Sequence, residues 1–250
     1  MKFLRLKTVL VSFLLITGLI FFSVADSHAY PTLQLDIASG SYDFSTDTIV
    51  ATGNTFTLYA YLIQNNRNLL SDTYYISAAV SPKVGKDGAN LGSFTFNGTN
   101  VDVTSGMDAY GVPPLESIVT LQGWDNGDLP KHGIFPTYFS EFEFQFSSSN
   151  QISAYNTMQR AIFGSSIPAS GTGMYYAAFT IDTSLLDPNY VIHFDLYNTK
   201  LKKGIDIDVT QFAPFSHDAE SRHQEVPEPS TVLLLGSGLV GLWASRRFFI

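Results

Sequence analysis

The chain of 250 residues contains no cysteine and few charged residues, and both features exclude certain kinds of chemistry, structure and partner. Without cysteine there is no disulfide, no thiolate metal ligand, no thiol nucleophile and no lipid attached through sulfur. Only 14% of residues are charged while 14% are aromatic, which excludes a disordered chain and a coiled coil. Basic residues are also scarce, with 14 Lys+Arg against 22 Asp+Glu and a net charge of -8. We therefore predict no binding to nucleic acid, because its phosphates would be repelled.

The first 29 residues have the three parts of a secretory signal peptide. Three basic residues precede an apolar run over residues 8–25, and small residues follow at Ser27 and Ala29. This order is the one that signal peptidase recognises. We predict export through the inner membrane and cleavage between Ala29 and Tyr30, with an uncleaved membrane anchor as the alternative.

The last 24 residues, 227–250, combine a short motif, an apolar run and a basic pair. The motif consists of Pro227, Glu228 and Pro229. Residues 231–245 are apolar, and as a helix they would extend about 22 Å, less than the ~30 Å hydrocarbon core. We predict a short transmembrane helix in a locally thinned membrane, with Arg246 and Arg247 as the cytoplasmic stop-transfer signal. A buried C-terminal core helix is the alternative.

This tail resembles the PEP-CTERM sorting signal of Gram-negative bacteria in the order and terminal position of its three parts. The resemblance implies an exosortase, a transpeptidase-like membrane enzyme, as the partner that removes the tail near the motif. The chain would be membrane-anchored until then, and would finish on the cell surface or in the extracellular matrix. Such tails occur in bacteria that make extracellular polysaccharide, which makes a biofilm polysaccharide an expected partner. The three apolar residues after the arginines depart from the family pattern and leave the efficiency of recognition open.

Between the two ends, residues 30–216 predict an all-β domain. Short β-branched and aromatic runs are broken by Gly, Pro, Asn and Asp, and no stretch shows a helical period. This pattern is typical of a single antiparallel β-sandwich or jelly roll. We expect a half-buried first strand over 33–37, and residues 217–226 to form an exposed polar linker. The other expected strands are 55–63, 73–80, 93–96, 141–146, 174–181, 190–197 and 205–209.

The body of the chain also resembles the bacterial "choice-of-anchor N" family, whose members carry different C-terminal surface-anchoring signals. The resemblance rests on residues 56–60, 75–79, 132–139 and 212–219 and covers nearly all of the mature domain. It implies no particular activity.

A catalytic or metal site would have to be built from histidines and carboxylates. The available side chains are His132, His193, Glu141, Asp195 and Asp218. His193 and Asp195 share a strand face, which allows ligation, but a solvated strand face is the favoured interpretation. His132 lies in a turn where a hydrogen-bonding role is favoured. The chain contains no HExxH, HxH or GxSxG motif, so we predict no catalytic residue, no metal and no cofactor.

A calcium site is a weaker alternative in the segment around Gly127. Its oxygen ligands would be Asp125, Asn126 and Asp128. Because Leu129-Pro130 interrupts the spacing of a calcium loop, a plain Asx-turn is favoured.

The leading hypothesis is therefore a non-enzymatic exported protein of the cell surface or matrix. A polysaccharide-binding module with exposed aromatic residues is one alternative, although aromatics at strand spacing are more often core. The aromatic candidates are Tyr74, Tyr75, Tyr110, Trp124, Tyr138, Tyr175 and Tyr176. A glycan hydrolase that uses carboxylates such as Asp125 and Glu141 is the other alternative.

Overall fold

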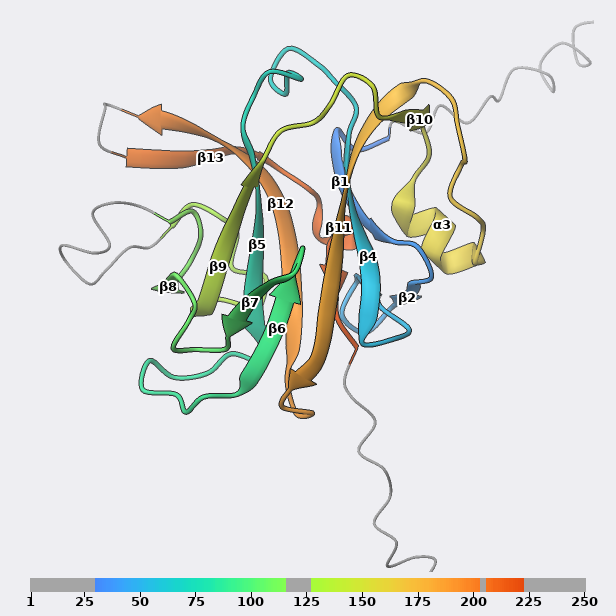
Figure 1. Ribbon diagram of the computed structural model, residues 1–250. Helices are drawn as coiled ribbons and strands as arrows, with labels where there is room; N and C mark the ends of the chain where they lie inside the picture. Colours follow the sequence, from blue (N-terminus) through green and yellow to red (C-terminus); the bar gives the residue numbers. More distant parts are fainter. Residues whose placement is uncertain (1–29, 116–126, 203–205, 223–250) are drawn as a thin grey trace, which may run out of the picture. The chain divides into compact units, whose positions relative to one another are not determined.

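The computed structural model of the protein describes residues 30–115, 127–202 and 206–222 (Figure 1). The predicted signal peptide, the C-terminal tail with its apolar run, and the calcium candidates Asp125 and Asn126 lie outside these residues. Among the described residues, no helix combines the length and the apolar character needed to cross a membrane.

Two β-sheets pack face to face, which confirms the predicted all-β sandwich (Figure 1). The first sheet has the strand order β1 (Leu33–Ile37), β4 (Thr55–Leu62), β11 (Gly173–Leu186), β6 (Gly92–Phe96) and β7 (Thr99–Asp102), and β10 (Gln151–Ser153) also pairs with β11. The second sheet has the order β2 (Ser41–Asp43), β3 (Thr48–Val50), β14 (Ala219–Glu220), β12 (Val191–Lys202), β5 (Tyr74–Ser81), β9 (Thr137–Phe144) and β8 (Ala109–Gly111), and β13 (Asp206–Phe212) also pairs with β12. These strand pairs are antiparallel, except that β14 runs parallel to β3.

The period-two alternation of side chains decides which residues form the core between the sheets. In β12, Ile192, Phe194 and Leu196 lie in the core, so His193 and Asp195 must face the opposite side of the second sheet. The neighbouring strand β5 alternates in the same way, with Ile76, Ala78 and Val80 in the core. The outer face of the second sheet therefore carries the polar side chains.

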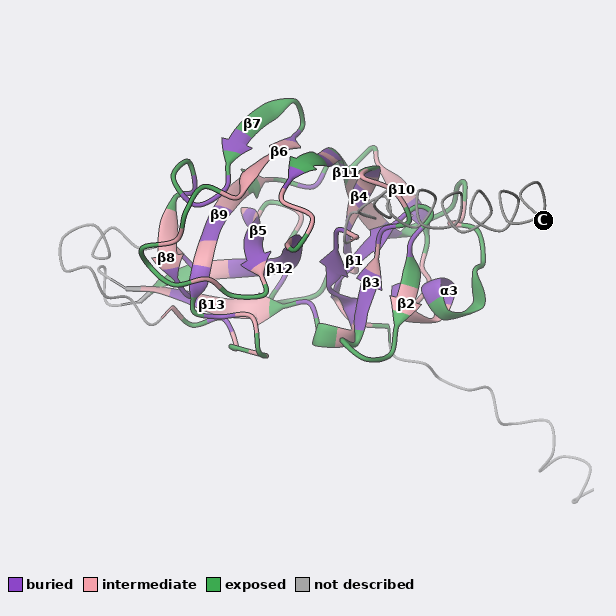
Figure 2. Ribbon diagram, turned by 90° about the horizontal axis from the view of Figure 1, so that it is seen from below, coloured by how far each residue is buried: buried purple, intermediate pink, exposed green. Residues whose placement is uncertain are grey.

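This outer face is covered by other parts of the chain. Leu129 and Phe135, from the segment before β9, form a second apolar cluster with Ala79, Phe139 and Tyr197 of the sheet. Strand β12 is consequently buried over residues 191–198 on both of its faces (Figure 2). A strand position that would face water in an open sheet is here enclosed.

A short helix, α3 (Thr157–Phe163), contacts β1 and β2 in a part of the chain where no helix was predicted (Figure 1). Its seven residues are too few to show a helical period. Both ends are nevertheless marked, because the Asn156 side chain accepts a hydrogen bond from Gln159 N and Gly164 ends the helix at φ 63°. The expected half-burial of the first strand is also wrong, since all five residues of β1 are buried.

The predicted exposed linker is wrong for residues 217–221. The one-turn helix η1 (Phe215–His217) leads into β14, which pairs with both β12 and β3. All residues from 217 to 221 are buried, because β14 fills a place inside the second sheet. The remainder of that linker, 223–226, lies outside the described residues.

Candidate functional site

Four side chains from three separate segments converge on the outer face of the second sheet. Strand β12 supplies His193 and Asp195, the turn before β9 supplies His132, and the residue between η1 and β14 is Asp218. One ligand atom of each residue lies within 4.8 Å of the ligand atoms of the other three. We call these four residues the His–Asp cluster.

The distances within the His–Asp cluster are short and similar. The two imidazole Nε2 atoms lie 3.1 Å apart. Asp195 Oδ1 lies 3.4 Å from Nε2 of His132 and 3.6 Å from Nε2 of His193. Asp218 Oδ2 lies 3.7 Å and 3.6 Å from the same two nitrogens. Four nitrogen and oxygen atoms thus surround one small space.

The surroundings of each imidazole indicate which nitrogen carries the proton. His132 Nδ1 lies 2.7 Å from the carbonyl oxygen of Pro130, which can only accept, so Nδ1 must donate. His193 Nδ1 lies 3.4 Å from a carboxylate oxygen of Glu220, which also favours the Nδ1–H form. In the neutral rings, both Nε2 atoms therefore direct lone pairs into the cluster.

The two carboxylates of the cluster differ in their partners. Asp195 accepts a hydrogen bond from the Ser77 hydroxyl at 3.2 Å. Neither oxygen of Asp218 accepts a hydrogen bond from any described residue. A buried carboxylate without a donor is costly, so Asp218 requires a cation or a proton from elsewhere.

The cluster is enclosed rather than open. His193, Asp195 and Asp218 are only 1%, 3% and 1% exposed. The ring of Phe215 stacks on His132 with centroids 4.3 Å apart, and Phe135 meets the same ring edge-on. The favoured interpretation of His193 and Asp195 as a solvated strand face is therefore wrong, because distant segments cover that face.

Electrostatics within the enclosure favour added positive charge. Burial alone lowers the pKa of His193, but the carboxylates of Asp195, Asp218 and Glu220 raise it well above 6.5. Burial and the nearby Asp195 charge raise the pKa of Asp218 well above its usual range. For the neighbouring His217, burial lowers the pKa to about 4. The cluster can hold a proton or a divalent cation. When neither is bound, the lone pairs of its nitrogen and oxygen atoms repel one another.

Glu141, the third carboxylate that the sequence offered, does not belong to the cluster. It lies on β9, separated from Asp195 by Ser77 of β5 in the strand register. It accepts hydrogen bonds from Leu115 N at 2.8 Å and from the Tyr197 hydroxyl. Burial raises the pKa of this carboxyl. Its proposed hydrolytic partner Asp125 lies outside the described residues.

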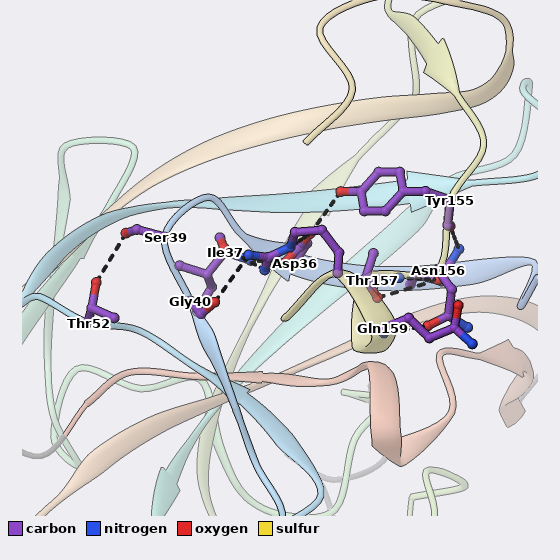
Figure 3. Close-up of polar contacts among 11 residues, drawn as sticks. Asp36, Ile37, Ser39, Gly40, Thr52, Tyr155, Asn156, Thr157 and Gln159 are labelled. Carbon is purple, nitrogen blue, oxygen red and sulfur yellow. Dashed lines mark hydrogen bonds and ion pairs between the residues drawn. The ribbon is translucent and has the colours of Figure 1, made fainter. Parts of the chain in front are cut away.

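A second buried polar cluster, which was not predicted from the sequence, lies where α3 meets β1. The guanidinium of Arg160 forms a bidentate ion pair with Asp36, with Nε 2.9 Å from Oδ2. Figure 3 shows the Tyr155 hydroxyl directed at Asp36, to which it donates at 2.8 Å. Arg160 also donates to the carbonyl oxygens of Ile37 at 2.9 Å and Gly40 at 3.1 Å. The charges of Arg160 and Asp36 thus neutralise each other within the chain.

An aromatic hollow of about 280 Å³ lies on the outer side of the first sheet. Its lining includes Tyr59 and Tyr61 of β4 and Tyr176 of β11. The rings of Tyr59 and Tyr61 stack with centroids 5.9 Å apart. Of the aromatic residues proposed for binding, Tyr176 lines this hollow, Tyr74 is fully buried, and Trp124 lies outside the described residues.

The calcium alternative stays a prediction. Asp128 is exposed in the described part of the chain, but Asp125 and Asn126 lie outside it. The predicted cleavage-site residue Ala29, the sorting motif and the arginines predicted to stop transfer also lie outside it.

Comparison with known proteins identifies the C-terminal tail. Residues 225–247 match the PEP-CTERM protein-sorting motif family. No curated protein matches the chain. The motif marks the chain as an exported protein that an exosortase sorts to the cell surface.

Proposed function

We propose that the chain is a non-enzymatic protein of the bacterial surface or extracellular matrix, with the β-sandwich as its functional part. The observation that carries this proposal is the position of the sorting motif. The match over residues 225–247 begins three residues after Arg222, the last described residue of the sandwich. Removal of the tail near Pro227-Glu228-Pro229 would leave the sandwich complete and release it from its membrane helix.

The burial of the most reactive side chains supports a role other than catalysis. General acids, bases and nucleophiles must touch their substrate. His193 and Asp195 of strand β12 are at most 3% exposed, and Asp218 is 1% exposed. A polysaccharide chain could not reach them without local unfolding. The His–Asp cluster is therefore better suited to holding the domain together.

Cell fractionation tests the export and sorting steps. The full chain is expressed in a Gram-negative host that has an exosortase, and the inner membrane, the cell surface and the medium are separated. We expect wild-type chain without its tail on the surface or in the medium. The combined variant Pro227→Ala, Glu228→Ala, Pro229→Ala should accumulate in the inner membrane at full length.

A matched proline variant, Pro168→Ala, serves as the control because it changes a proline of the sandwich and leaves the tail intact. It should be processed like the wild type. Wild-type chain found in the cytosol with both ends intact would contradict the proposal.

The aromatic hollow favours one second candidate, a polysaccharide-binding module of the matrix. Sugar rings stack on exposed aromatic faces, and the hollow of about 280 Å³ is lined by the partly exposed Tyr59 and Tyr176. We expect Tyr59→Ala to weaken binding to the host's own polysaccharide about tenfold, equivalent to about 1.4 kcal/mol. Tyr110→Ala, on β8 of the second sheet, is the control and should bind normally. Absence of binding by the wild type in a glycan array would reject this candidate.

A further inference from the structure

We propose that the His–Asp cluster binds one divalent transition-metal ion of the Zn²⁺ type. The ligand atoms would be His132 Nε2, His193 Nε2, Asp195 Oδ1 and Asp218 Oδ2. The two carboxylates supply two negative charges, which a divalent cation neutralises.

The geometry of the four atoms fits a tetrahedral ion. A tetrahedron with metal–ligand bonds of about 2.0–2.1 Å has edges of roughly 3.3–3.4 Å. The five nitrogen–nitrogen and nitrogen–oxygen pairs of the cluster lie 3.1–3.7 Å apart. The sixth pair, the two carboxylate oxygens, lies within 4.8 Å. Only small movements of the side chains would place all four atoms on one ion.

The unpartnered Asp218 is an independent reason to expect a cation. This side chain is 1% exposed and aimed at both imidazole Nε2 atoms, yet it accepts no hydrogen bond from the described residues. When both imidazoles are neutral and carry their proton on Nδ1, no group of the cluster can donate to Asp218, and protonation of His193 is the alternative to a metal ion. A metal ion satisfies Asp218 and both imidazole lone pairs at once.

The ligand types select among metals. Two neutral imidazoles with two carboxylates suit Zn²⁺ and related transition ions, whereas Ca²⁺ prefers six to eight oxygen ligands. The groups behind the ligands also match a metal site, since histidine ligands normally give their second N–H to a carbonyl or a carboxylate. Pro130 O takes this place for His132, and a carboxylate oxygen of Glu220 lies 3.4 Å from Nδ1 of His193 without forming a hydrogen bond to it. Ser77 orients Asp195 by donating its hydroxyl hydrogen to the carboxylate at 3.2 Å.

The expected role of the ion is structural. All four ligands come from the protein and are nearly buried, so no coordination position is open to a substrate. The ion would tie the turn before β9 and the segment before β14 to strand β12. That segment is the last part of the sandwich before the sorting tail, so metal binding would lock the C-terminal end of the domain.

Metal content and titration test the proposal directly. The full chain, purified in a mild detergent and stripped with EDTA, is dialysed against ZnCl₂ and analysed by elemental mass spectrometry. We expect one tightly bound Zn²⁺ per chain. Co²⁺ in place of Zn²⁺ should give the strong visible absorption of a four-coordinate ion. Calcium chloride should not compete.

Variants locate the ion. Asp218→Asn and His132→Gln should each lower Zn²⁺ affinity more than about 100-fold, and Glu220→Gln should lower it about 10–100-fold. His132 lies in a turn, so its variant keeps the test valid if Asp218→Asn fails to fold, which circular dichroism will show. The control Asp87→Asn changes an exposed carboxylate and should bind like the wild type.

Three outcomes would overturn the proposal. The first is a wild-type chain that binds no Zn²⁺ after dialysis, which would mean that protons alone neutralise the cluster. The second is binding that Asp218→Asn and His132→Gln leave unchanged, because the ion would then lie elsewhere. The third is a preference for Ca²⁺ over Zn²⁺.

Discussion

The two buried polar clusters of this sandwich solve the same physical problem in different ways. Asp36 and Asp218 are both carboxylates with at most 1% of their surface exposed. Asp36 receives hydrogen bonds from Arg160, Tyr155 and the backbone N–H of Ile37. Asp218 receives none from the described residues, and its neighbours are another carboxylate and two imidazoles.

The difference shows how a folded domain can tolerate buried charge. A carboxylate taken out of water loses several kcal/mol unless donors or a countercharge replace its hydration. At Asp36 the chain itself supplies the countercharge, so the cluster is complete. At Asp218 the neighbours are a carboxylate and two imidazoles, so its charge is balanced only when a proton or a cation joins the cluster. The first cluster is self-contained and the second depends on what it binds.

The largest change in the free energy of unfolding is expected when the positive charge of Arg160 is removed. Arg160→Met leaves Asp36 buried without its ion pair and should lower the free energy of unfolding by about 3–5 kcal/mol. Urea denaturation followed by circular dichroism measures this loss. Arg67→Met, at an exposed arginine, should stay within about 0.5 kcal/mol of the wild type. A loss at Arg160 of less than about 1 kcal/mol would mean that Asp36 needs no countercharge.

Removal of one hydrogen-bond donor to Asp36 should lower the free energy of unfolding by less than the loss of Arg160 does. Tyr155→Phe deletes the hydroxyl that donates to Asp36 at 2.8 Å and should lower the free energy of unfolding by about 1.5–3 kcal/mol. Tyr175→Phe, at a partly buried tyrosine of β11, is the matched control and should have little effect. Equal losses in the two variants would show that the hydrogen bond to Asp36 contributes nothing specific.

In the absence of metal, substitution of Asp218 should change the free energy of unfolding in the opposite direction from the substitutions around Asp36. In EDTA, Asp218→Asn removes a buried charge that has no donor, and it should raise the free energy of unfolding by about 1–2 kcal/mol. In excess Zn²⁺ the order should reverse, because only the wild type gains binding energy. Thermal unfolding in both conditions measures this crossing. Destabilisation of Asp218→Asn in EDTA would mean that Asp218 is already satisfied and would remove the contrast with Asp36.

The smallest expected effect concerns the helix that carries Arg160. Asn156→Ala removes the side chain that accepts from Gln159 N at 2.8 Å and should cost about 1 kcal/mol. Asn156→Asp keeps an acceptor in place and should retain wild-type stability. If the alanine variant has the same urea midpoint of unfolding as the wild type, the Asn156 cap does not stabilise the helix that carries Arg160.

Strand positions were predictable because their signal is local. Alternating residues in β1, β4 and β5 mark a pleated strand whatever the rest of the chain does, and these strands begin and end within one residue of the predicted ranges. Strand β12 begins near its predicted start but continues five residues past its predicted end. Helix α3 was missed because seven residues are too few for a period. Its cap residues Asn156 and Gly164 were present in the sequence and were the only local signal.

The candidate site was predictable only in part. Two-residue spacing correctly placed His193 and Asp195 on one face of a strand. Whether that face meets water depends on segments far away in the chain, and His132 is 61 residues from His193. The polar composition of residues 217–221 suggested an exposed linker, but β14 pairs inside a sheet and buries them.

The sandwich class and the exosortase-sorted tail follow from local sequence, because strand alternation and a linear sorting motif both lie in neighbouring residues. The enclosed space that two histidines and two aspartates share, and the pairing of Arg160 with Asp36, follow only from the folded arrangement, because burial and charge pairing arise between residues distant in sequence. Their cost or benefit is fixed when the covering segments close over the sheet.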